Sequence, residues 1–252
     1  MGAQPVVLVH GLGVSSRYFV PTQTRLAQRF RVYAVDLPGF GKSESPARPL
    51  DIPGLASALA GWMQANGLTR AAFVGNSMGC QVIACLAMCR PELVERAVLS
   101  APTMDPHARG AVRQLLRLLV AAPRERPVLL LLVACDYVKS GVIRTAITFR
   151  HALSDRIETR LPHLPMPVMV VRGARDPIVS QRWVEEAAAL LPDGRLRVLS
   201  GSAHAAHFST PAAFTGAIGP FLLDCDAGCG TRDAATSNAS ASPETVVARS
   251  LP

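Results

Sequence analysis

The chain has 252 residues, of which 49% are hydrophobic and 17% are charged. This composition excludes a largely disordered protein, and the length suits one sizeable domain with a substantial core. The longest apolar run, Val128–Cys135, is too short to cross a bilayer as a helix, and the N-terminus lacks the basic and apolar regions of a secretory signal. We therefore predict a cytoplasmic protein with no integral membrane segment.

The formal net charge is +8, and residues 102–164 supply +5 of it, with ten Lys or Arg against five Asp or Glu. No nucleic-acid motif accompanies this charge, so we expect no nucleic-acid partner. Arg109, Arg113 and Arg117 are spaced four apart and share one helix face. Such a stripe can attract anionic substrates, partners or lipid headgroups, but we favour a solvated face of a helix whose other side is buried. The side predicted to be buried carries Val112, Leu115, Leu116 and Leu119.

Short β-type runs alternate with helical segments, which is typical of a parallel sheet covered by helices on both faces. In the first part of the chain, strands are predicted at 6–10, 31–36, 71–75 and 97–101, and helices at 51–66 and 77–90. After residue 102 the pattern changes to several helices, which are interrupted by Pro123, Pro127 and Gly141. The alternation resumes at Pro167, with strands at 168–172 and 195–199 and helices at 180–191 and 211–223.

This pattern predicts an α/β core over residues 1–101 and 165–223, with a helical insertion at 102–164. Residues 224–252 have almost no large apolar side chain, so we expect a disordered tail there. Cys225 and Cys229 lie in this tail, but a metal site would need two more ligands and none is nearby. We therefore expect no metal site.

The segment FVGNSMGC, residues 73–80, joins a predicted strand to a predicted helix through a Gly-X-Ser-X-Gly pattern. By chance, roughly one chain of this length in ten carries such a pattern. The pattern alone therefore does not identify a nucleophile, and its position between a strand and a helix is the stronger indication. Ser77 must turn sharply there, which strains its backbone and points its hydroxyl into the cleft beyond the sheet. Gly75 and Gly79 let the strand and helix approach, whereas a simple N-cap serine needs no glycine on both sides. Ser77 is therefore predicted to be a nucleophile.

A serine hydroxyl is a weak nucleophile, and it needs a histidine base that is oriented by a carboxylate. Asp176 and His204 each follow a predicted strand, and the order Ser77, Asp176, His204 is that of hydrolases with a nucleophile elbow. His207 is the alternative base. Asp105, which follows the strand ending near residue 101, is the alternative acid.

The other histidines and one further aspartate are assigned structural roles. His10 is expected to be a structural residue at the end of a strand, and Asp36 is expected to brace the following loop through hydrogen bonds. His107, His151 and His163 are interpreted as surface or packing residues of the insertion.

Residues 5–223 resemble the α/β-hydrolase superfamily. The similar segments, in the family's order, are HGLG, DLPGFGKS, GNSMG, RGARDPIV and GSAHAAHFSTPAAF, and the resemblance is weak in the insertion. It implies the α/β-hydrolase fold, with Ser77 as nucleophile, Asp176 as acid and His204 rather than His207 as base. It also implies an oxyanion hole made by the backbone N–H groups of Leu12 and Met78. Only five residues precede the first predicted strand, so we expect the sheet to lack one or two N-terminal strands that relatives usually carry.

A Ser-His-Asp site transfers an acyl group to water through an acyl-enzyme and needs no cofactor. The insertion resembles a lid, and its leucines suggest an apolar acyl or alcohol group. We therefore expect a carboxylic-ester hydrolase that acts on a small, partly apolar substrate. Two alternatives stay open: a carbon–carbon bond hydrolase of the meta-cleavage-product type, whose elbow GNSMG resembles, and a non-catalytic hydrolase fold that binds a ligand. The sequence does not indicate an oligomeric state.

Overall fold

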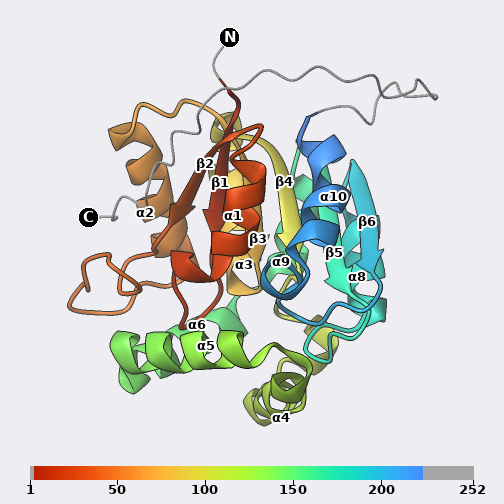
Figure 1. The fold of residues 1–252 in the computed structure, drawn as a ribbon. Helices are drawn as coiled ribbons and strands as arrows, with labels where there is room; N and C mark the ends of the chain where they lie inside the picture. The colour runs from red at the N-terminus through yellow and green to blue at the C-terminus, as the bar shows by residue number, and fades with distance from the viewer. Residues whose placement is uncertain (1–2, 224–252) are drawn as a thin grey trace.

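The computed structural model describes residues 3–223 of the chain (Figure 1). Six parallel strands in this range form one sheet in the order β2-β1-β3-β4-β5-β6, with β2 and β6 at its edges. Helices cover both faces of the sheet, so the predicted α/β fold is confirmed. The strands are β1 (Pro5–Val9), β2 (Arg31–Val35), β3 (Ala71–Asn76), β4 (Val94–Ser100), β5 (Val168–Gly173) and β6 (Gly194–Leu199).

The helices follow the predicted alternation with the strands, except for two additional short helices, one near the N-terminus and one just before the last helix. They are α1 (Val20–Leu26), α2 (Ile52–Ala65), α3 (Met78–Cys89), α4 (Ala111–Ala121), α5 (Pro127–Ser140), α6 (Val142–Ser154), α7 (Ile157–Arg160), α8 (Gln181–Leu190), α9 (Ala206–Ser209) and α10 (Pro211–Leu222). The sequence pattern does not indicate α1, because only Thr22 and Leu26 of its seven residues are buried.

Two apolar cores lie on the two faces of the sheet. Val7 and Val9 of β1 pack into the core that contains buried residues of α2, α3 and α8. Val6 and Leu8 point the other way and pack into the core that contains buried residues of α1, α9 and α10. Every residue of β3 and β5 is buried, as expected for strands of a parallel sheet that is covered on both faces.

The helices α4 to α7 occupy the chain between β4 and β5, where the sequence predicts the helical insertion. Figure 1 shows α4, α5 and α6 beyond the C-terminal ends of the strands. Gly141 separates α5 from α6 with a φ of 82°, a conformation that glycine adopts readily. The insertion therefore faces the edge of the sheet where ligands bind in such folds.

The predicted orientation of α4 is wrong. Val112, Leu115, Leu116 and Leu119, which were expected to be buried, are 74%, 57%, 57% and 67% exposed. Arg117 points inward instead, because its guanidinium donates hydrogen bonds to the buried carboxylate of Asp105 and to a backbone carbonyl. A buried carboxylate needs a charged or hydrogen-bonding partner, and this requirement outweighs the apolar preference of the leucines.

Two further sequence predictions concern membranes and the C-terminus. No helix within residues 3–223 combines the length and the apolar character needed to cross a bilayer. The predicted disordered tail at 224–252, with Cys225 and Cys229, lies outside the described residues.

Candidate active site

Ser77 occupies a sharp turn between β3 and α3. Its φ of 55° and ψ of −120° are a conformation that L-residues rarely adopt. A Cβ atom at Gly79 would lie 2.8 Å from the carbonyl oxygen of His10 and even closer to that of Val9. A Cβ atom at Gly75 would lie 2.6 Å from Ile83 Cδ1. Both glycines are therefore required for the helix to pack this closely on the strands, as the motif predicts.

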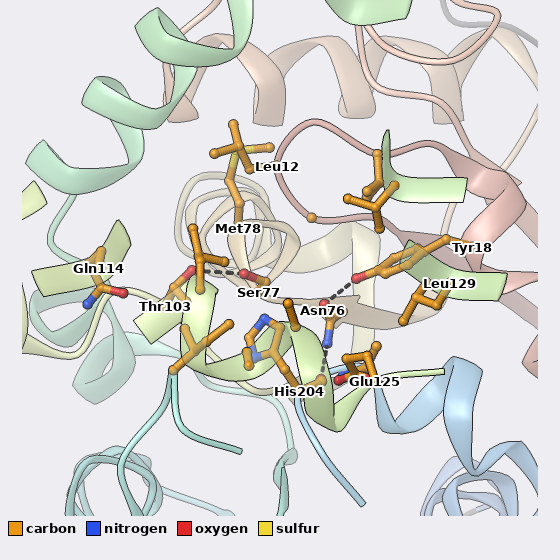
Figure 2. A pocket seen from close by; sticks show the side chains of 18 of the residues that line it. Leu12, Tyr18, Asn76, Ser77, Met78, Thr103, Gln114, Glu125, Leu129 and His204 are labelled. Carbon is orange, nitrogen blue, oxygen red and sulfur yellow. Dashed lines mark hydrogen bonds between the residues drawn. The ribbon is translucent and has the colours of Figure 1, made fainter. Parts of the chain in front are cut away.

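A cavity of about 340 Å³ lies against Ser77 (Figure 2). His204 lines the same cavity, and Figure 2 shows its ring beside Ser77. The Ser77 hydroxyl lies 3.5 Å from the hydroxyl of Thr103. The insertion supplies much of the remaining wall, which is mostly apolar and includes Leu118, Leu129, Val133 and Phe149. The cavity thus places Ser77 beside space for an apolar group.

The carboxylate of Asp176 contacts the ring of His204 from the side away from the cavity. His204 Nδ1 donates a hydrogen bond of 2.9 Å to Asp176 Oδ2. The other oxygen, Oδ1, accepts hydrogen bonds from the backbone N–H groups of Ile178 and Val179 at 2.8 and 3.3 Å. This arrangement places the ring hydrogen on Nδ1, so Nε2 is left as the basic nitrogen of His204.

Arg172 of β5 organises the loop that carries Asp176. Its buried guanidinium donates to the backbone carbonyl oxygens of Val179 and Asp176 at 2.8 and 2.7 Å, and to that of Ala174 at 3.2 Å. These bonds connect three points of one short loop to a single rigid strand. Asp176 is therefore held in place by its backbone as well as by its side chain.

The pKa of His204 lies above the ordinary histidine value of 6.5. Burial lowers this pKa, but the negative charge and hydrogen bond of Asp176, together with the charge of Glu125, outweigh the burial. The same interactions stabilise the imidazolium that forms when His204 accepts a proton. Such a histidine is suited to act as a general base.

The structure places the alternative acid and base away from this arrangement. Asp105 accepts hydrogen bonds from Arg117 and Ser180 rather than from a histidine. His207 is completely buried among aromatic rings, and neither of its ring nitrogens has a hydrogen-bond partner among the described residues. Burial lowers the pKa of His207 well below 6.5, and the charge of His204 lowers it further. Asp176 and His204 are hydrogen-bonded to each other, and His204 lines the cavity together with Ser77.

His10 and Asp36 have the structural roles that the sequence predicts. His10 is buried at the end of β1, where Nε2 accepts a 3.0 Å hydrogen bond from the N–H of Leu37 and Nδ1 donates to the Gly11 carbonyl. Asp36 accepts hydrogen bonds from the backbone N–H groups of Ser16 and Lys42 at 2.6 and 2.8 Å. The two side chains hold the loops that follow β1 and β2.

The histidines of the insertion lie away from the cavity lining. His107 and His163 are exposed and His151 is half-buried. His107 Nε2 contacts the carboxylate of Glu186 at 2.6 Å. These positions agree with the predicted surface or packing roles.

The backbone positions predicted for an oxyanion hole lie next to Ser77. Met78 is the first residue of α3, so its N–H belongs to the helix turn that has no intrahelical acceptor. A Cβ atom at Gly11 would lie 3.3 Å from Ser77 Cβ, and Leu12 follows directly. Leu12 and Met78 both line the cavity (Figure 2).

Several side chains at the site are not indicated by the sequence analysis. Asn76 accepts a hydrogen bond from the hydroxyl of Tyr18 and donates to the carbonyl of His204 at 3.2 Å, so it connects the turn at Ser77 to the loop of His204 (Figure 2). Glu125 belongs to the insertion, and its carboxylate accepts hydrogen bonds from the N–H of Ala205 and the hydroxyl of Ser209 at 2.8 and 2.7 Å. Asn76 lies inside the elbow motif, whereas no local pattern marks Glu125.

The described part of the chain, residues 3–223, contains no group of three or more His, Cys, Asp or Glu that could hold a metal ion.

Comparisons with known proteins agree with this fold. A sequence profile of the alpha/beta hydrolase family matches residues 6–217. A candidate carbamate hydrolase, RutD, from Yersinia enterocolitica (serotype O:8 / biotype 1B) is 29% identical over 244 residues, which cover 88% of this chain and 88% of the relative.

Two solved structures share the fold at 24% sequence identity. An esterase from Thermogutta terrifontis has a TM-score of 0.77 and covers 88% of this chain and 90% of its own. The enol-lactonase from Burkholderia xenovorans LB400 has a TM-score of 0.74 and covers 88% of this chain and 92% of its own. Because the family profile spans most of the sequence, we conclude that the chain belongs to the alpha/beta hydrolase family.

Proposed function

We propose that the protein is a serine hydrolase that cleaves carboxylic esters of small, partly apolar substrates. The observation that carries this proposal is the shared cavity of Ser77 and His204, with Asp176 hydrogen-bonded to the far side of the histidine ring. A nucleophile, a base and an orienting carboxylate in this arrangement form a unit for acyl transfer.

The proposed reaction has two acyl-transfer steps. The Ser77 hydroxyl turns away from the Thr103 hydroxyl, gives its proton to His204 Nε2 and attacks the ester carbonyl carbon. The N–H groups of Leu12 and Met78 bind the oxyanion that forms. The protonated His204 then donates this proton to the departing alcohol, which leaves an acyl group on Ser77. In the second step His204 removes a proton from water, the hydroxide attacks the acyl group, and Ser77 recovers the proton as the acid departs.

The apolar cavity wall and the relatives favour ester hydrolysis over the alternatives. Leu118, Leu129 and Val133 offer contacts for an apolar acyl or alcohol group, whereas polar groups gather near Ser77. The names of the esterase and the enol-lactonase with the same fold both describe hydrolysis of ester bonds. RutD, the relative at 29% identity, is named for carbamates, which are also attacked at a carbonyl carbon.

We further propose that residues 102–164 act as a lid on the core formed by 1–101 and 165–223. The insertion contributes about half of the side chains around the cavity, and it lies across the C-terminal ends of the strands (Figure 1). A lid in this place shields the site from bulk solvent while the substrate is bound, and it selects substrates by the shape of their apolar part.

Labelling with a fluorophosphonate probe tests the nucleophile directly. The wild-type protein is expected to become labelled at Ser77, and Ser77→Ala should remain unlabelled. A panel of p-nitrophenyl esters of increasing chain length then measures the preferred acyl group. The ester proposal is abandoned if no ester is turned over, and turnover of a vinylogous 1,5-diketone alone would identify a carbon–carbon bond hydrolase instead. If Ser77→Ala binds the ligand as tightly as the wild type and has the same biological effect, the non-catalytic alternative is supported.

A further inference from the structure

The exposed apolar side chains of the protein are concentrated on the helical insertion. Thirteen of the eighteen large apolar side chains that are exposed within residues 3–223 lie between residues 112 and 147. Several are exposed to an extent that is unusual for their type, including Val138 at 81%, Val142 at 80% and Ile143 at 78%. A concentration of this kind on a single segment marks an interaction site.

The exposed apolar residues follow the helical repeat, so each helix presents a continuous apolar stripe to solvent. On α5, Val128, Leu131 and Val138 are exposed at spacings of three and seven residues. On α4, exposed apolar side chains occupy positions 112, 115, 116 and 119. Figure 1 shows α4, α5 and α6 together at one end of the molecule, beyond the strands. We call the exposed apolar side chains of these three helices the insertion face.

The exposed charges that the insertion itself carries have one sign. The exposed charged side chains of residues 102–164 are all basic: Arg113, Arg124, Arg126, Lys139, Arg150 and Arg156. Arg126 and Lys139 stand at the two ends of α5 and therefore flank its apolar stripe.

The five carboxylates of the same segment are buried or half-buried, and each has a hydrogen-bonding or ionic partner. Asp105 pairs with Arg117, Asp136 accepts a 2.6 Å hydrogen bond from the hydroxyl of Ser15, and Glu125 accepts one from the N–H of Ala205. Asp155 and Glu158 pair with other arginines of the insertion. The segment is thus anchored inward by its acids, while apolar and basic groups remain outside.

We propose that the insertion face docks on the surface of an anionic lipid bilayer. Apolar side chains that insert shallowly between lipids, flanked by cations that pair with anionic headgroups, are the pattern of a peripheral membrane-binding surface. A second copy of this chain fits less well, because a symmetric contact would bring Arg126 and Lys139 of two molecules close to each other. No membrane-spanning helix is needed for such binding.

The insertion face also reaches the cavity. Leu118, Leu119 and Leu130 are exposed and at the same time line the cavity beside Ser77. A bilayer in contact with this face would therefore lie at the cavity mouth, and an apolar molecule could pass from the lipid to the site without crossing water. This consequence rests on the proposed esterase function, whereas docking itself depends only on the surface.

Flotation of the full chain with large unilamellar vesicles tests the docking. We expect binding to vesicles of equal parts phosphatidylcholine and phosphatidylglycerol, and much weaker binding to phosphatidylcholine alone. Leu115→Gln combined with Leu116→Gln should weaken the partition coefficient about tenfold or more, because two apolar side chains are lost from the face. Arg126→Gln combined with Lys139→Gln should weaken binding to the anionic vesicles about thirtyfold at low salt.

A matched control replaces exposed apolar residues at the opposite end of the fold. Met88 and Leu190 are 41% and 39% exposed, and they lie at the C-terminal ends of α3 and α8. Met88→Gln combined with Leu190→Gln should leave vesicle binding unchanged. All three double variants should hydrolyse a soluble short ester like the wild type. Ser77→Ala should bind vesicles normally while losing activity. These two results separate docking from the esterase proposal.

Absence of flotation with every vesicle would overturn the proposal, as would equal loss of binding in the control variant. Sedimentation provides a further check: if the wild type forms a dimer that Leu115→Gln with Leu116→Gln dissociates, and no vesicle binding is seen, the face is an interface between copies of this chain.

Discussion

Arg117 Nη1 lies 3.1 Å from Asp105 Oδ2, and this ion pair connects α4 to the loop that follows β4. Ser180, the residue before α8, donates a hydrogen bond of 2.9 Å to the same carboxylate oxygen. The pair decides which side of α4 meets solvent, because a helix that keeps Arg117 at the buried carboxylate has to turn its leucines outward. The exposed apolar side of α4 is therefore a consequence of a polar contact beneath that helix.

The two aspartates that follow strands should respond very differently to the loss of their charge. Asp176→Asn is expected to reduce kcat for an ester about 10⁴-fold, because the amide no longer holds the correct tautomer of His204. Asp105→Asn should leave kcat within about tenfold and act mainly on stability, since its partners are Arg117 and Ser180. Steady-state kinetics and urea unfolding of both variants distinguish these effects. A larger loss of kcat in Asp105→Asn would make Asp105 the acid.

The pH dependence of kcat/KM should report the raised pKa of His204. His204 acts as a base only when neutral, so kcat/KM is expected to fall as the pH drops through a pKa that lies above 6.5. The negative charge of Glu125 contributes to this raised pKa, so Glu125→Gln should move the acidic limb of the profile to lower pH. Glu158→Gln is the matched control, because Glu158 pairs with Arg109. An acidic limb below pH 6.5, or one that Glu125→Gln leaves unmoved, would contradict this account.

The close packing of α3 on the sheet should make Gly79 intolerant of a methyl group. Gly79→Ala is expected to destabilise the fold by about 1–3 kcal/mol, because the new Cβ would overlap backbone carbonyl oxygens that cannot move independently. Gly61 is the control: it lies inside α2, and a Cβ atom added there would meet nothing within 4 Å. Gly61→Ala should stabilise the protein by about 0.5–1 kcal/mol. Chemical unfolding gives both values, and similar effects of the two substitutions would refute the packing argument.

The buried ring of His207 should make stability depend on pH. Its pKa in the folded protein is well below 6.5, mainly because of burial, so between that pKa and 6.5 only the unfolded chain binds the proton. Stability is therefore complete above pH 6.5 and falls as the pH decreases below it. His207→Phe, which keeps an aromatic ring against Tyr18 and Phe19, should reduce this slope by up to about 1.4 kcal/mol per pH unit. Urea unfolding between about pH 7.5 and about pH 5 measures the slope, and an unchanged slope would show that His207 is not responsible.

The sheet and the positions of Ser77, Asp176 and His204 could be predicted because they depend on local patterns. Most strands are short apolar runs, and Ser77, Asp176 and His204 each lie within the first few residues after a strand. The parallel topology then brings the ends of β3, β5 and β6 to one edge of the sheet. Sequence order and strand position were therefore sufficient for this part of the site.

The insertion could not be predicted to the same extent because its contacts join distant parts of the chain. The orientation of α4 depends on which residues the core presents to it, and a helical repeat alone does not contain this information. Glu125 similarly reaches the backbone of Ala205, 80 residues away in the sequence. The periodicity of α4 identified two unlike faces correctly, but the usual assumption that the apolar face is buried failed.

The backbone of Ser77 has a consequence for thermal stability that is independent of its chemistry. A serine held at φ 55° and ψ −120° costs the folded state about 1–3 kcal/mol relative to an unstrained residue. Glycine adopts this conformation with little strain, so a chain with Ser77→Gly should unfold at a higher temperature although it has lost its hydroxyl. The variant with the highest unfolding temperature would then be inactive. The serine at this turn lowers thermal stability in return for its proposed catalytic activity.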